Sequence, residues 1–458
     1  MAVLRGDEME KMKKMIKRFN DNNKILKNPA MGWVIYIDNF EDDFPDADVF
    51  FSEMEKPVEF SNILYIRVPW AFLEPEEGRY AWLYDENYKK LINIALKKGL
   101  QLAFLVYIAS KDCQIQATPQ YVRDYGASGY ILEDKWSPCL DDEIYHKAFE
   151  VFIGAFAKEY DDADKTAFID AFGVGYWGEC SNFYYPPEKE KSDFLKEVFD
   201  WCISAYKNVF HNVLLGVQYQ GSDFTWEQAD YAIDELSYIA RRNSFGSPVW
   251  FRDKYKKPFM KILGRSPVFA ENCYHHVVSR TSWWMGDGFD DIGEMFDSVL
   301  NDAYESKANT LDLRVVEDAN AYVDNFPEKV TEFALRCGYR FLPVEFEIVY
   351  NGSKLEIKHV WKNQGIGYLP NRKRNWDSKY KIAFMLKGEN NQLIIDKEIE
   401  LEELLGGETK EYLSTFENIN SFDEIYLGII NEKGEKRKIS LPIDEKCEDG
   451  FYYIGKMD

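Results

Sequence analysis

Histidine and cysteine are scarce in this chain, and each shortage excludes a class of site. Five His and seven Cys are present in 458 residues. The seven Cys have no regular spacing, so neither a disulfide framework nor a paired-thiolate metal site is indicated. Scattered thiols instead fit a reducing compartment. So few His give poor support for a metal-dependent hydrolase, which needs His and Asp clustered at strand ends.

Positive charge is also in short supply. The chain holds 56 Lys and Arg against 79 Asp and Glu, which gives a net charge of −23 at pH 7. A nucleic-acid groove requires clustered cations that replace counterions on phosphate, so we expect no nucleic-acid partner. The acidity is typical of a surface that repels other copies of itself. The oligomeric state is left open by the sequence.

Long apolar runs are absent as well. No stretch of about 18 apolar residues occurs, so we expect no membrane span. The first 27 residues are charged and lack the apolar centre of a signal peptide, which predicts a cytoplasmic location. The alternative is a secreted protein whose signal has been removed. No glycine-rich phosphate fingerprint follows the first strand-like run and no calcium-loop spacing is present, so we expect no cofactor and no metal.

Apolar runs that suit buried strands alternate with amphipathic runs that suit helices between residues 28 and 340. This alternation predicts a parallel sheet covered on both faces. Eight strand candidates match a (β/α)₈ TIM barrel, and an open doubly wound sheet is the alternative. The expected strands are 33–37, 63–68, 100–108, 167–174, 213–218, 238–242, 267–270 and 310–315. The expected helices are 84–98, 144–159, 190–208, 226–236, 292–307 and 327–337.

After residue 340 the pattern changes to alternation at period two with short turns such as Asn351-Gly352. It predicts antiparallel strands joined by hairpins, and hence an all-β immunoglobulin-like sandwich. A structural role and a carbohydrate-binding role for this sandwich are both open. Residues 363–376 predict a loop long enough to reach the barrel mouth. The expected strands are 344–350, 355–361, 380–386, 393–400, 410–416, 424–430, 437–441 and 451–454.

Three parts are therefore expected along the chain. Residues 1–27 form a charged N-terminal leader, residues 28–340 form the barrel, and residues 341–458 form the β-sandwich domain. The barrel is the part in which chemistry is expected, because barrel enzymes build their sites where the strands end.

Two glutamates close apolar, aromatic-rich runs within the expected barrel. Glu179 follows the fourth expected strand, and Glu271 ends the seventh. A carboxylate at the C-terminal end of a barrel strand is poorly placed for stability and well placed for chemistry. Two such carboxylates are the minimum set for glycosidic bond cleavage. The alternative for Glu179 is a helix cap or a loop ion pair.

Several motifs carry a resemblance to a known group of enzymes. Residues 67–70 (Arg-Val-Pro-Trp) and the turn at 73–80 (Leu-Glu-Pro-Glu-Glu-Gly-Arg-Tyr) resemble the retaining glycoside hydrolases of clan A, especially the β-galactosidase-like members. The start at 28–33, the segment 175–179 (Gly-Tyr-Trp-Gly-Glu) and the segment 361–365 also resemble an uncharacterised bacterial family of glycosidase-like barrels with a C-terminal β-sandwich.

The resemblance implies roles for particular residues. Clan members place the acid/base after the fourth strand and the nucleophile at the end of the seventh, which here are Glu179 and Glu271. The resemblance also implies an Arg near the nucleophile, at the place of Arg67. Clan members usually carry Asn directly before the acid/base, where it binds the sugar 2-hydroxyl. Gly178 stands there in this chain, which leaves that contact without an assigned residue.

Ten residues near the expected mouth are candidates for binding a sugar. Aromatic rings make flat, amphipathic walls for sugars, and the polar members offer hydrogen bonds. Each has a structural alternative, which is core packing for the rings and an ion pair for the charged groups. Asp170, in mid-strand, is interpreted either as structural or as a support for a residue of the site. The substrate-binding candidates are Arg67, Trp70, Trp177, Gln218, Tyr219, Arg242, Tyr274, His275, Trp283 and Trp284.

Together these patterns predict a retaining glycoside hydrolase. It would cleave an oligo- or polysaccharide by a two-carboxylate double displacement, with carbohydrate as its partner. The rival hypothesis is a non-catalytic carbohydrate-binding protein on a degenerate glycosidase barrel, because a fold does not fix an activity. A carboxyl separation of about 5–5.5 Å predicts retention and about 6.5–9.5 Å predicts inversion. The sugar and the linkage are left open.

Overall fold

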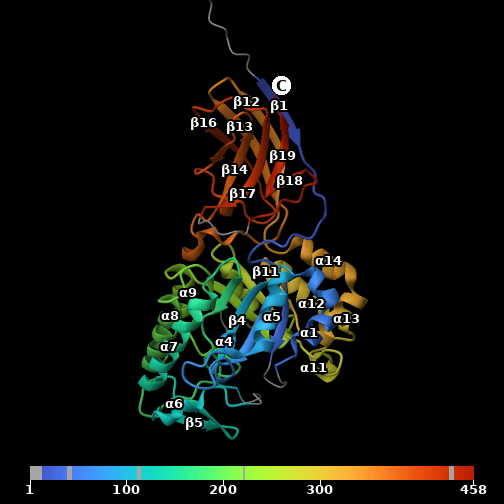
Figure 1. The fold of residues 1–458 in the computed structure, drawn as a ribbon. Coiled ribbons are helices and arrows are strands. Elements are labelled where there is room, and N and C mark those ends of the chain that lie inside the picture. The colour runs from blue at the N-terminus through green and yellow to red at the C-terminus, as the bar shows by residue number, and fades with distance from the viewer. Residues whose placement is uncertain (1–12, 39–43, 111–114, 220–221, 433–437, 458) are drawn as a thin grey trace, which may run out of the picture. The chain divides into compact units, whose positions relative to one another are not determined.

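The computed structural model describes residues 13–38, 44–110, 115–219, 222–432 and 438–457. Within them the chain forms two compact units, coloured along the chain in Figure 1. The barrel unit comprises Lys27–Gly338 and Leu369–Asp377. The sandwich unit comprises Tyr339–Tyr368, the chain from Ser378 onward and an N-terminal segment that ends at Leu26. The first twelve residues of the predicted leader lie outside the described residues.

The barrel unit contains a closed barrel of eight strands, each parallel to its neighbours (Figure 1). Most strand residues are buried, which explains why the strands read as continuous apolar runs. Each predicted strand overlaps one observed strand, so the barrel is confirmed and the doubly wound alternative is wrong. The strands are β2 (Gly32–Asp38), β3 (Ser61–Pro69), β4 (Gln101–Tyr107), β7 (Thr166–Asp170), β8 (Leu214–Gln218), β9 (Ile239–Phe245), β10 (Val268–Asn272) and β11 (Ala308–Leu313).

Amphipathic helices connect the barrel strands and cover their outer face (Figure 1). Asp85 caps the N-terminus of α5, the helix that precedes β4, by accepting a hydrogen bond from the backbone N–H of Tyr88. The longer helices are α5 (Glu86–Lys97), α7 (Glu143–Tyr160), α8 (Lys191–Lys207), α9 (Trp226–Asp234), α12 (Ile292–Glu305), α13 (Val316–Asn325) and α14 (Pro327–Arg336). The shorter ones are α1 (Ala47–Glu53), α2 (Glu55–Phe60), α3 (Trp70–Leu73), α4 (Ala81–Tyr84), α6 (Gln120–Asp124), α10 (Lys256–Phe259) and α11 (Thr281–Gly286).

The turn after β3 is held together by a buried carboxylate. Glu74 accepts hydrogen bonds from the indole of Trp70 at 2.8 Å and from the hydroxyl of Tyr121 at 3.0 Å. Its other oxygen accepts from the backbone N–H of Gly78 at 2.8 Å. Burial raises the pKa of Glu74. The motif at residues 73–80 therefore fixes the conformation of this turn.

The sandwich unit is built from two antiparallel sheets, which confirms the all-β prediction. The two sheets pack against each other through Phe384, whose ring contacts those of Phe346 and Phe416 on the opposite sheet. One sheet contains β1 (Lys13–Arg18), β12 (Phe341–Tyr350), β13 (Leu355–Asn363) and β16 (Thr409–Phe416). The other contains β14 (Tyr380–Lys387), β15 (Gln392–Ile395), β17 (Glu424–Asn431), β18 (Cys447–Glu448) and β19 (Phe451–Lys456).

Two details of the sandwich differ from the sequence expectation. The N-terminal strand β1 pairs antiparallel with β12, so residues 13–18 belong to this sheet (Figure 1). The expected strand at 437–441 is represented among the described residues only by a bridge between Ile439 and Ile429. Arg437 lies outside the described residues.

The loop at residues 363–376 does not reach the barrel mouth, and that prediction is wrong. Lys373 donates to the carbonyls of Ile233 and Arg265, at 3.3 and 3.2 Å. Asn375 donates to the carbonyl of Val213 at 2.6 Å. All three carbonyls precede barrel strands, so the loop binds at the face where the strands begin. The site described below lies at the opposite face.

Candidate functional site

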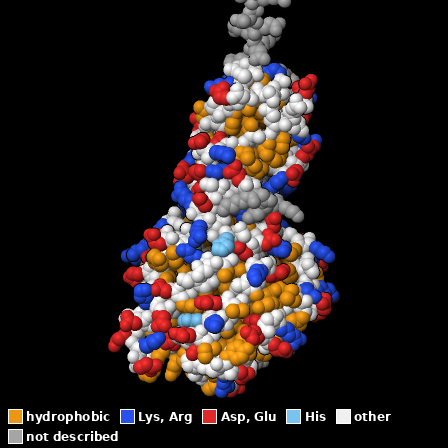
Figure 2. Space-filling model, turned by 60° about the vertical axis from the view of Figure 1, so that its left-hand side comes forward, with side chains coloured by type: hydrophobic (Ala, Val, Ile, Leu, Met, Phe, Trp, Pro, Cys, Tyr) orange, Lys and Arg blue, Asp and Glu red, His pale blue; other side chains and the backbone are white. Residues whose placement is uncertain are grey.

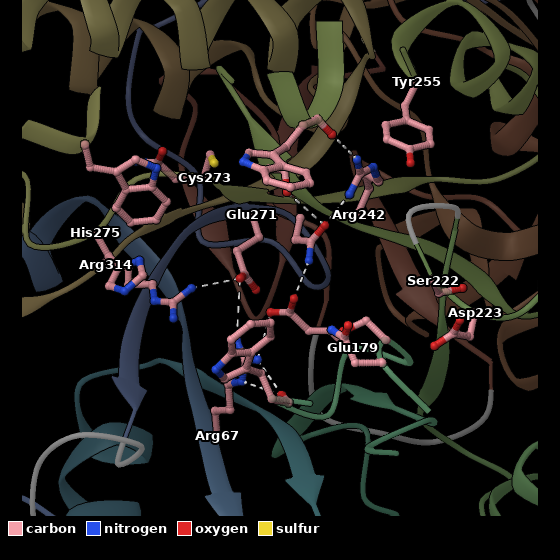
Figure 3. A pocket seen from close by; sticks show the side chains of 18 of the residues that line it. Arg67, Glu179, Ser222, Asp223, Arg242, Tyr255, Glu271, Cys273, His275 and Arg314 are labelled. Carbon is pink, nitrogen blue, oxygen red and sulfur yellow. Dashed lines mark hydrogen bonds and ion pairs between the residues drawn. The ribbon is translucent and has the colours of Figure 1, made fainter. Parts of the chain in front are cut away.

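A cavity of about 730 Å³ opens at the C-terminal ends of the barrel strands (Figure 3). The charged groups that line it come from several strands, as is usual for a barrel site. Arg67 lies in β3 and Glu271 in β10, whereas Glu179 follows β7 and Arg314 follows β11. The fourth and seventh strands of the barrel are β7 and β10. Both predicted glutamates therefore line one cavity.

Glu271 is buried among three arginines and a tyrosine. Its Oε1 accepts from Arg314 at 2.8 Å and lies 3.6 Å from Nη1 of Arg67. Its Oε2 accepts from Arg241 at 2.7 Å and from the hydroxyl of Tyr36 at 3.4 Å. Burial by itself would raise the pKa of Glu271, but the three guanidinium groups outweigh it and hold that pKa below its usual range. The carboxylate is therefore ionised at neutral pH.

Glu179 lies on the loop that follows β7 and is less enclosed than Glu271. Its side chain is 20% exposed, against 7% for Glu271. Its Oε1 accepts from Nη2 of Arg67 at 2.8 Å, and its Oε2 accepts from the side-chain amide of Asn243 at 2.6 Å. The two carboxylates thus contact different nitrogens of the single Arg67 guanidinium (Figure 3).

Arg67 is itself fixed from several sides. Its guanidinium donates to the backbone carbonyl of Trp177 and to the hydroxyl of Tyr36. Burial alone would lower the pKa of Arg67, but Tyr36, Glu179 and Glu271 raise it well above its usual range. Arg67 is therefore a permanent cation between the two glutamates.

The loop that carries Glu179 has a compact conformation with little room beside it. Trp177 and Gly178 both have positive φ, at 57° and 72°. A Cβ at Gly178 would lie 2.8 Å from the Cβ of Tyr107 and 3.2 Å from the Cα of Gly173. A side chain at position 178 would therefore clash with its surroundings. This accounts physically for Gly at the place where clan members carry Asn.

A second buried network supports the first. Asp170 in β7 accepts from Arg241 at 2.9 Å and from the hydroxyl of Tyr65 at 2.6 Å. Arg241 in turn donates to Glu271. Burial raises the pKa of Asp170. Asp170 orients Arg241 and does not line the cavity, which agrees with its interpretation as a structural or supporting residue.

Three indoles line the cavity. Trp177 and Trp283 were substrate-binding candidates, and Trp250 was not. Trp250 is 57% exposed and lies in a single π-helical turn, η1 (Pro248–Arg252), directly after β9. His275 contacts Trp283 edge to face. Burial, followed by the charge of Arg314, lowers the pKa of His275 to about 2, so its ring is neutral.

Five candidates lie outside the lining of this cavity, and their positions do not support a sugar contact. Trp70 is fully buried and donates to Glu74, while Trp284 donates to the carbonyl of Val277. The hydroxyls of Tyr219 and Tyr274 donate to Asp230 and Asp287. Gln218 is buried at the end of β8. None of these five residues lines the cavity. The five lining candidates are Arg67, Trp177, Arg242, His275 and Trp283.

The lining also includes residues that were not singled out from the sequence, among them Asn243, Trp250, Tyr255 and Arg314. Asn243 was missed because β9 extends to Phe245, three residues beyond the expected end. Arg314 was missed although it directly follows the eighth strand, where a charged residue is a usable signal. Trp250 and Tyr255 lie in the connection after β9, and the sequence gives no indication that this connection returns to the mouth.

The described residues contain no group of three or more His, Cys, Asp and Glu side chains arranged to hold a metal ion. Cys273 lines the cavity, but burial raises the pKa of its thiol to about 12, so it is protonated at neutral pH. Within the same described residues, none of the helices has both the length and the apolar character to cross a membrane.

No family model and no curated protein matches this chain. Solved structures of similar fold include glycoside hydrolases. An endo-glycoceramidase II from Rhodococcus sp. has 11% identity and a TM-score of 0.43, over 86% of this chain and 100% of that one. A β-galactosidase from the psychrophilic Marinomonas ef1 has 9% identity and a TM-score of 0.42, over 68% and 63%. An exo-β-1,4-mannosidase from Opitutaceae bacterium strain TAV5 has 13% identity and a TM-score of 0.42, over 66% and 59%.

Proposed function

We propose that this protein is a retaining glycoside hydrolase in which Glu271 is the nucleophile and Glu179 is the acid/base. One observation carries the proposal. Two carboxylates, from the fourth and seventh barrel strands, meet at one guanidinium inside a cavity that three indoles also line. Two carboxylates facing one space are the arrangement that glycosidic bond cleavage requires.

The environments of the two glutamates suit different steps. Glu271 is ionised and rigidly held by Arg67, Arg241 and Arg314, so it can attack the anomeric carbon. Glu179 lies on a loop and is more exposed, where it can protonate the leaving oxygen as the glycosidic bond breaks. After the leaving group departs, Glu179 can take a proton from water, and the resulting hydroxide equivalent releases the sugar from Glu271.

The indoles suggest how a sugar is held above these carboxylates. Trp177, Trp250 and Trp283 present apolar faces, and an exposed Trp such as Trp250 is costly without a ligand to cover it. We propose that these rings bind an oligo- or polysaccharide. The neutral ring of His275 is then available for a hydrogen bond to a sugar hydroxyl.

A non-catalytic carbohydrate-binding protein is the second candidate, and one observation favours it. Three guanidinium groups stabilise the Glu271 anion, and an anion that is stabilised in this way is a weaker nucleophile. The residue that clan members use for the sugar 2-hydroxyl is also absent, since Gly178 has no room for a side chain.

Kinetics on chromogenic aryl glycosides tests the proposal. Glu271→Gln should abolish turnover, because no carboxylate remains to form the covalent intermediate. Glu179→Gln should still cleave activated aryl glycosides in the first step and then accumulate the intermediate. Azide needs no general base, so it should restore the rate of Glu179→Gln and leave Glu271→Gln inactive. Glu86→Gln, on the surface of α5 with 87% of its side chain exposed, is the matched control.

Three results would contradict the assignment. Rescue of Glu271→Gln alone by azide means that the roles are reversed. Unchanged activity in both variants means that neither carboxylate takes part. Sugar binding by the wild type without turnover of any glycoside supports the non-catalytic candidate.

A further inference from the structure

Each of the three arginines that contact Glu271 also binds a second carboxylate. Each guanidinium is therefore a bridge between Glu271 and another acid, and its charge is divided between two anions. A carboxylate held by three undivided cations would be a weak nucleophile, and this division lessens their hold on it. The bridges are Arg67 to Glu179, Arg241 to Asp170 and Arg314 to Asp38.

The bridge through Arg241 is enclosed along its whole length. The side chains of Arg241, Asp170 and Glu271 are 6%, 1% and 7% exposed. Arg241 donates from Nη2 to Oε2 of Glu271 at 2.7 Å and from Nε to Oδ2 of Asp170 at 2.9 Å. Figure 2 shows charged side chains of both signs spread over the visible surface, where water and salt screen their interactions. A buried bridge is screened much less, so a change at one end of it is felt at the other.

Asp170 is fixed at its end of the bridge. The hydroxyl of Tyr65 donates to its Oδ2 at 2.6 Å, and the guanidinium carbon of Arg241 lies 5.1 Å from the centre of the Tyr65 ring. On the neighbouring strand β8, Gly216 leaves room for the carboxylate, since a Cβ there would lie 2.6 Å from Oδ1 of Asp170. Asp170 does not line the cavity, so it reaches the reaction through Arg241.

Other groups also face Glu271, and a pH test has to separate them from Asp170. Arg67 and Arg314 contact its Oε1, and the hydroxyl of Tyr36 donates to its Oε2 at 3.4 Å. Asp312, in β11, is a further buried acid. Burial, followed by the charge of Glu271, raises the pKa of Asp312 to about 7. The acids at the far ends of the other two bridges act on Glu271 through their arginines.

We propose that Asp170 is a positioning residue for the reaction: it divides the charge of Arg241, so that Glu271 is held in place and stays reactive. Without the charge of Asp170, Arg241 would bind Glu271 with its whole charge, and the carboxylate would be a poorer nucleophile. Without Arg241 as well, Glu271 would lose the cation that contacts its Oε2 and become more basic. The inference deepens the proposed glycosidase function and rests on it.

The pH dependence of kcat/KM on an activated aryl glycoside tests the inference with two variants. Asp170→Asn removes the charge and keeps an oxygen that accepts from Tyr65 and Arg241, so the acid limb should move to lower pH by roughly half a unit or more. Asp170→Asn combined with Arg241→Met leaves neither charge buried alone, and the acid limb should move to higher pH by about one unit. A purely structural role of Asp170 would not reverse the sign between the two variants.

Carbon-13 NMR measures the ionisation of Glu271 without any need for turnover. Labelling the glutamate carboxyl carbons leaves out Asp312, and Glu271→Gln assigns the signal of Glu271. Its titration midpoint should move in the same two directions as the acid limb. Asp134→Asn, at an aspartate with 85% of its side chain exposed, is the matched control for loss of one charge.

Tyr65→Phe keeps the test informative if Asp170→Asn fails to fold. It retains the ring and removes one hydrogen bond from Asp170, so the carboxylate should hold Arg241 more strongly. The hold of Arg241 on Glu271 then weakens, and the acid limb and the NMR midpoint should both move to higher pH.

The results separate the inference from the proposed function. Turnover with acid limbs that stay in place, or that move in one direction in both Asp170 variants, keeps the glycosidase and overturns the inference. A move to lower pH in Tyr65→Phe, or no move at all, also overturns it. If the wild type cleaves no glycoside, the proposed function fails. NMR midpoints that move in opposite directions then still support the division of charge, and any other pattern overturns it.

Discussion

The side-chain amide of Asn243 donates a hydrogen bond to Oε2 of Glu179 at 2.6 Å. Asn243 lies in the sixth barrel strand, β9, whereas Glu179 lies on the loop after the fourth. With Arg67 on the other oxygen, Asn243 fixes the direction in which this carboxyl faces the cavity. An amide beside the proposed acid/base is thus present, although position 178 cannot provide it.

Removing that amide should slow the reaction. We expect Asn243→Ala to lower kcat/KM for glycosides with poor leaving groups roughly 10- to 100-fold, the range of a hydrogen bond to a charged group. Activated aryl glycosides should suffer less, since they need little help from an acid. Asn325→Ala, at an exposed position at the end of α13, is the control. An equal effect on both substrate types would contradict a role through Glu179.

The arginines around Glu271 predict a pH dependence. Glu271 has a lowered pKa and must be ionised to act as a nucleophile. Arg314→Met removes one of the three cations, so the pKa of Glu271 should rise and the acid limb of the kcat/KM profile should move to higher pH. Arg314→Lys should shift it less. An acid limb that stays in place in Arg314→Met would show that a group other than Glu271 controls it.

Placing Asn at position 178, directly before the proposed acid/base, should destabilise the protein. We expect Gly178→Asn to lower the free energy of unfolding of the barrel unit by about 2 kcal/mol, because the new side chain clashes with Tyr107. Gly264 also has positive φ, at 80°, but has nothing within 4 Å of its missing Cβ. Gly264→Asn should therefore cost less than about 1 kcal/mol, since Asn tolerates this conformation. Denaturant unfolding of both variants measures the difference, and equal costs would rule out the clash.

The barrel and the positions of Glu179 and Glu271 could be predicted because parallel strands buried on both faces read as apolar runs. A polar residue at the end of such an apolar run lies at the barrel mouth, because all the strands end at that face. The same reasoning fails for aromatic side chains. Trp70 and Trp284 also follow strands, yet their indoles turn into the core to meet Glu74 and the carbonyl of Val277. The sequence alone does not determine whether an aromatic side chain points into the core or into the mouth.

Contacts between segments that are distant in the sequence could not be predicted either. Half-buried and exposed residues alternate along β1, from Lys13 to Arg18. Because Lys and Arg can bury their long stems and keep their charge in water, such a strand resembles a charged leader in the sequence. Arg314 binds a carboxylate 43 positions away, and nothing local to it signals that partner. The loop with Lys373 could be recognised as long, but the face it binds depends on carbonyls that precede three different barrel strands.

Lys373 gives the last prediction, which concerns stability. The residue is 5% exposed, and burial lowers the pKa of its ammonium group to about 8. The unfolded chain keeps the ordinary lysine value of 10.5, so it binds more protons than the folded protein between about pH 8 and 10.5. The contribution of Lys373 to stability is therefore present above pH 10.5 and is lost as the pH falls to about 8. Lys373→Met should raise the free energy of unfolding at pH 7 by up to about 3 kcal/mol, less whatever the two lost hydrogen bonds contribute. Urea unfolding of both proteins from pH 7 to 10.5 measures this, and the gain of the variant should shrink as the pH rises. A difference that stays constant across this range would show that Lys373 does not change its protonation on folding.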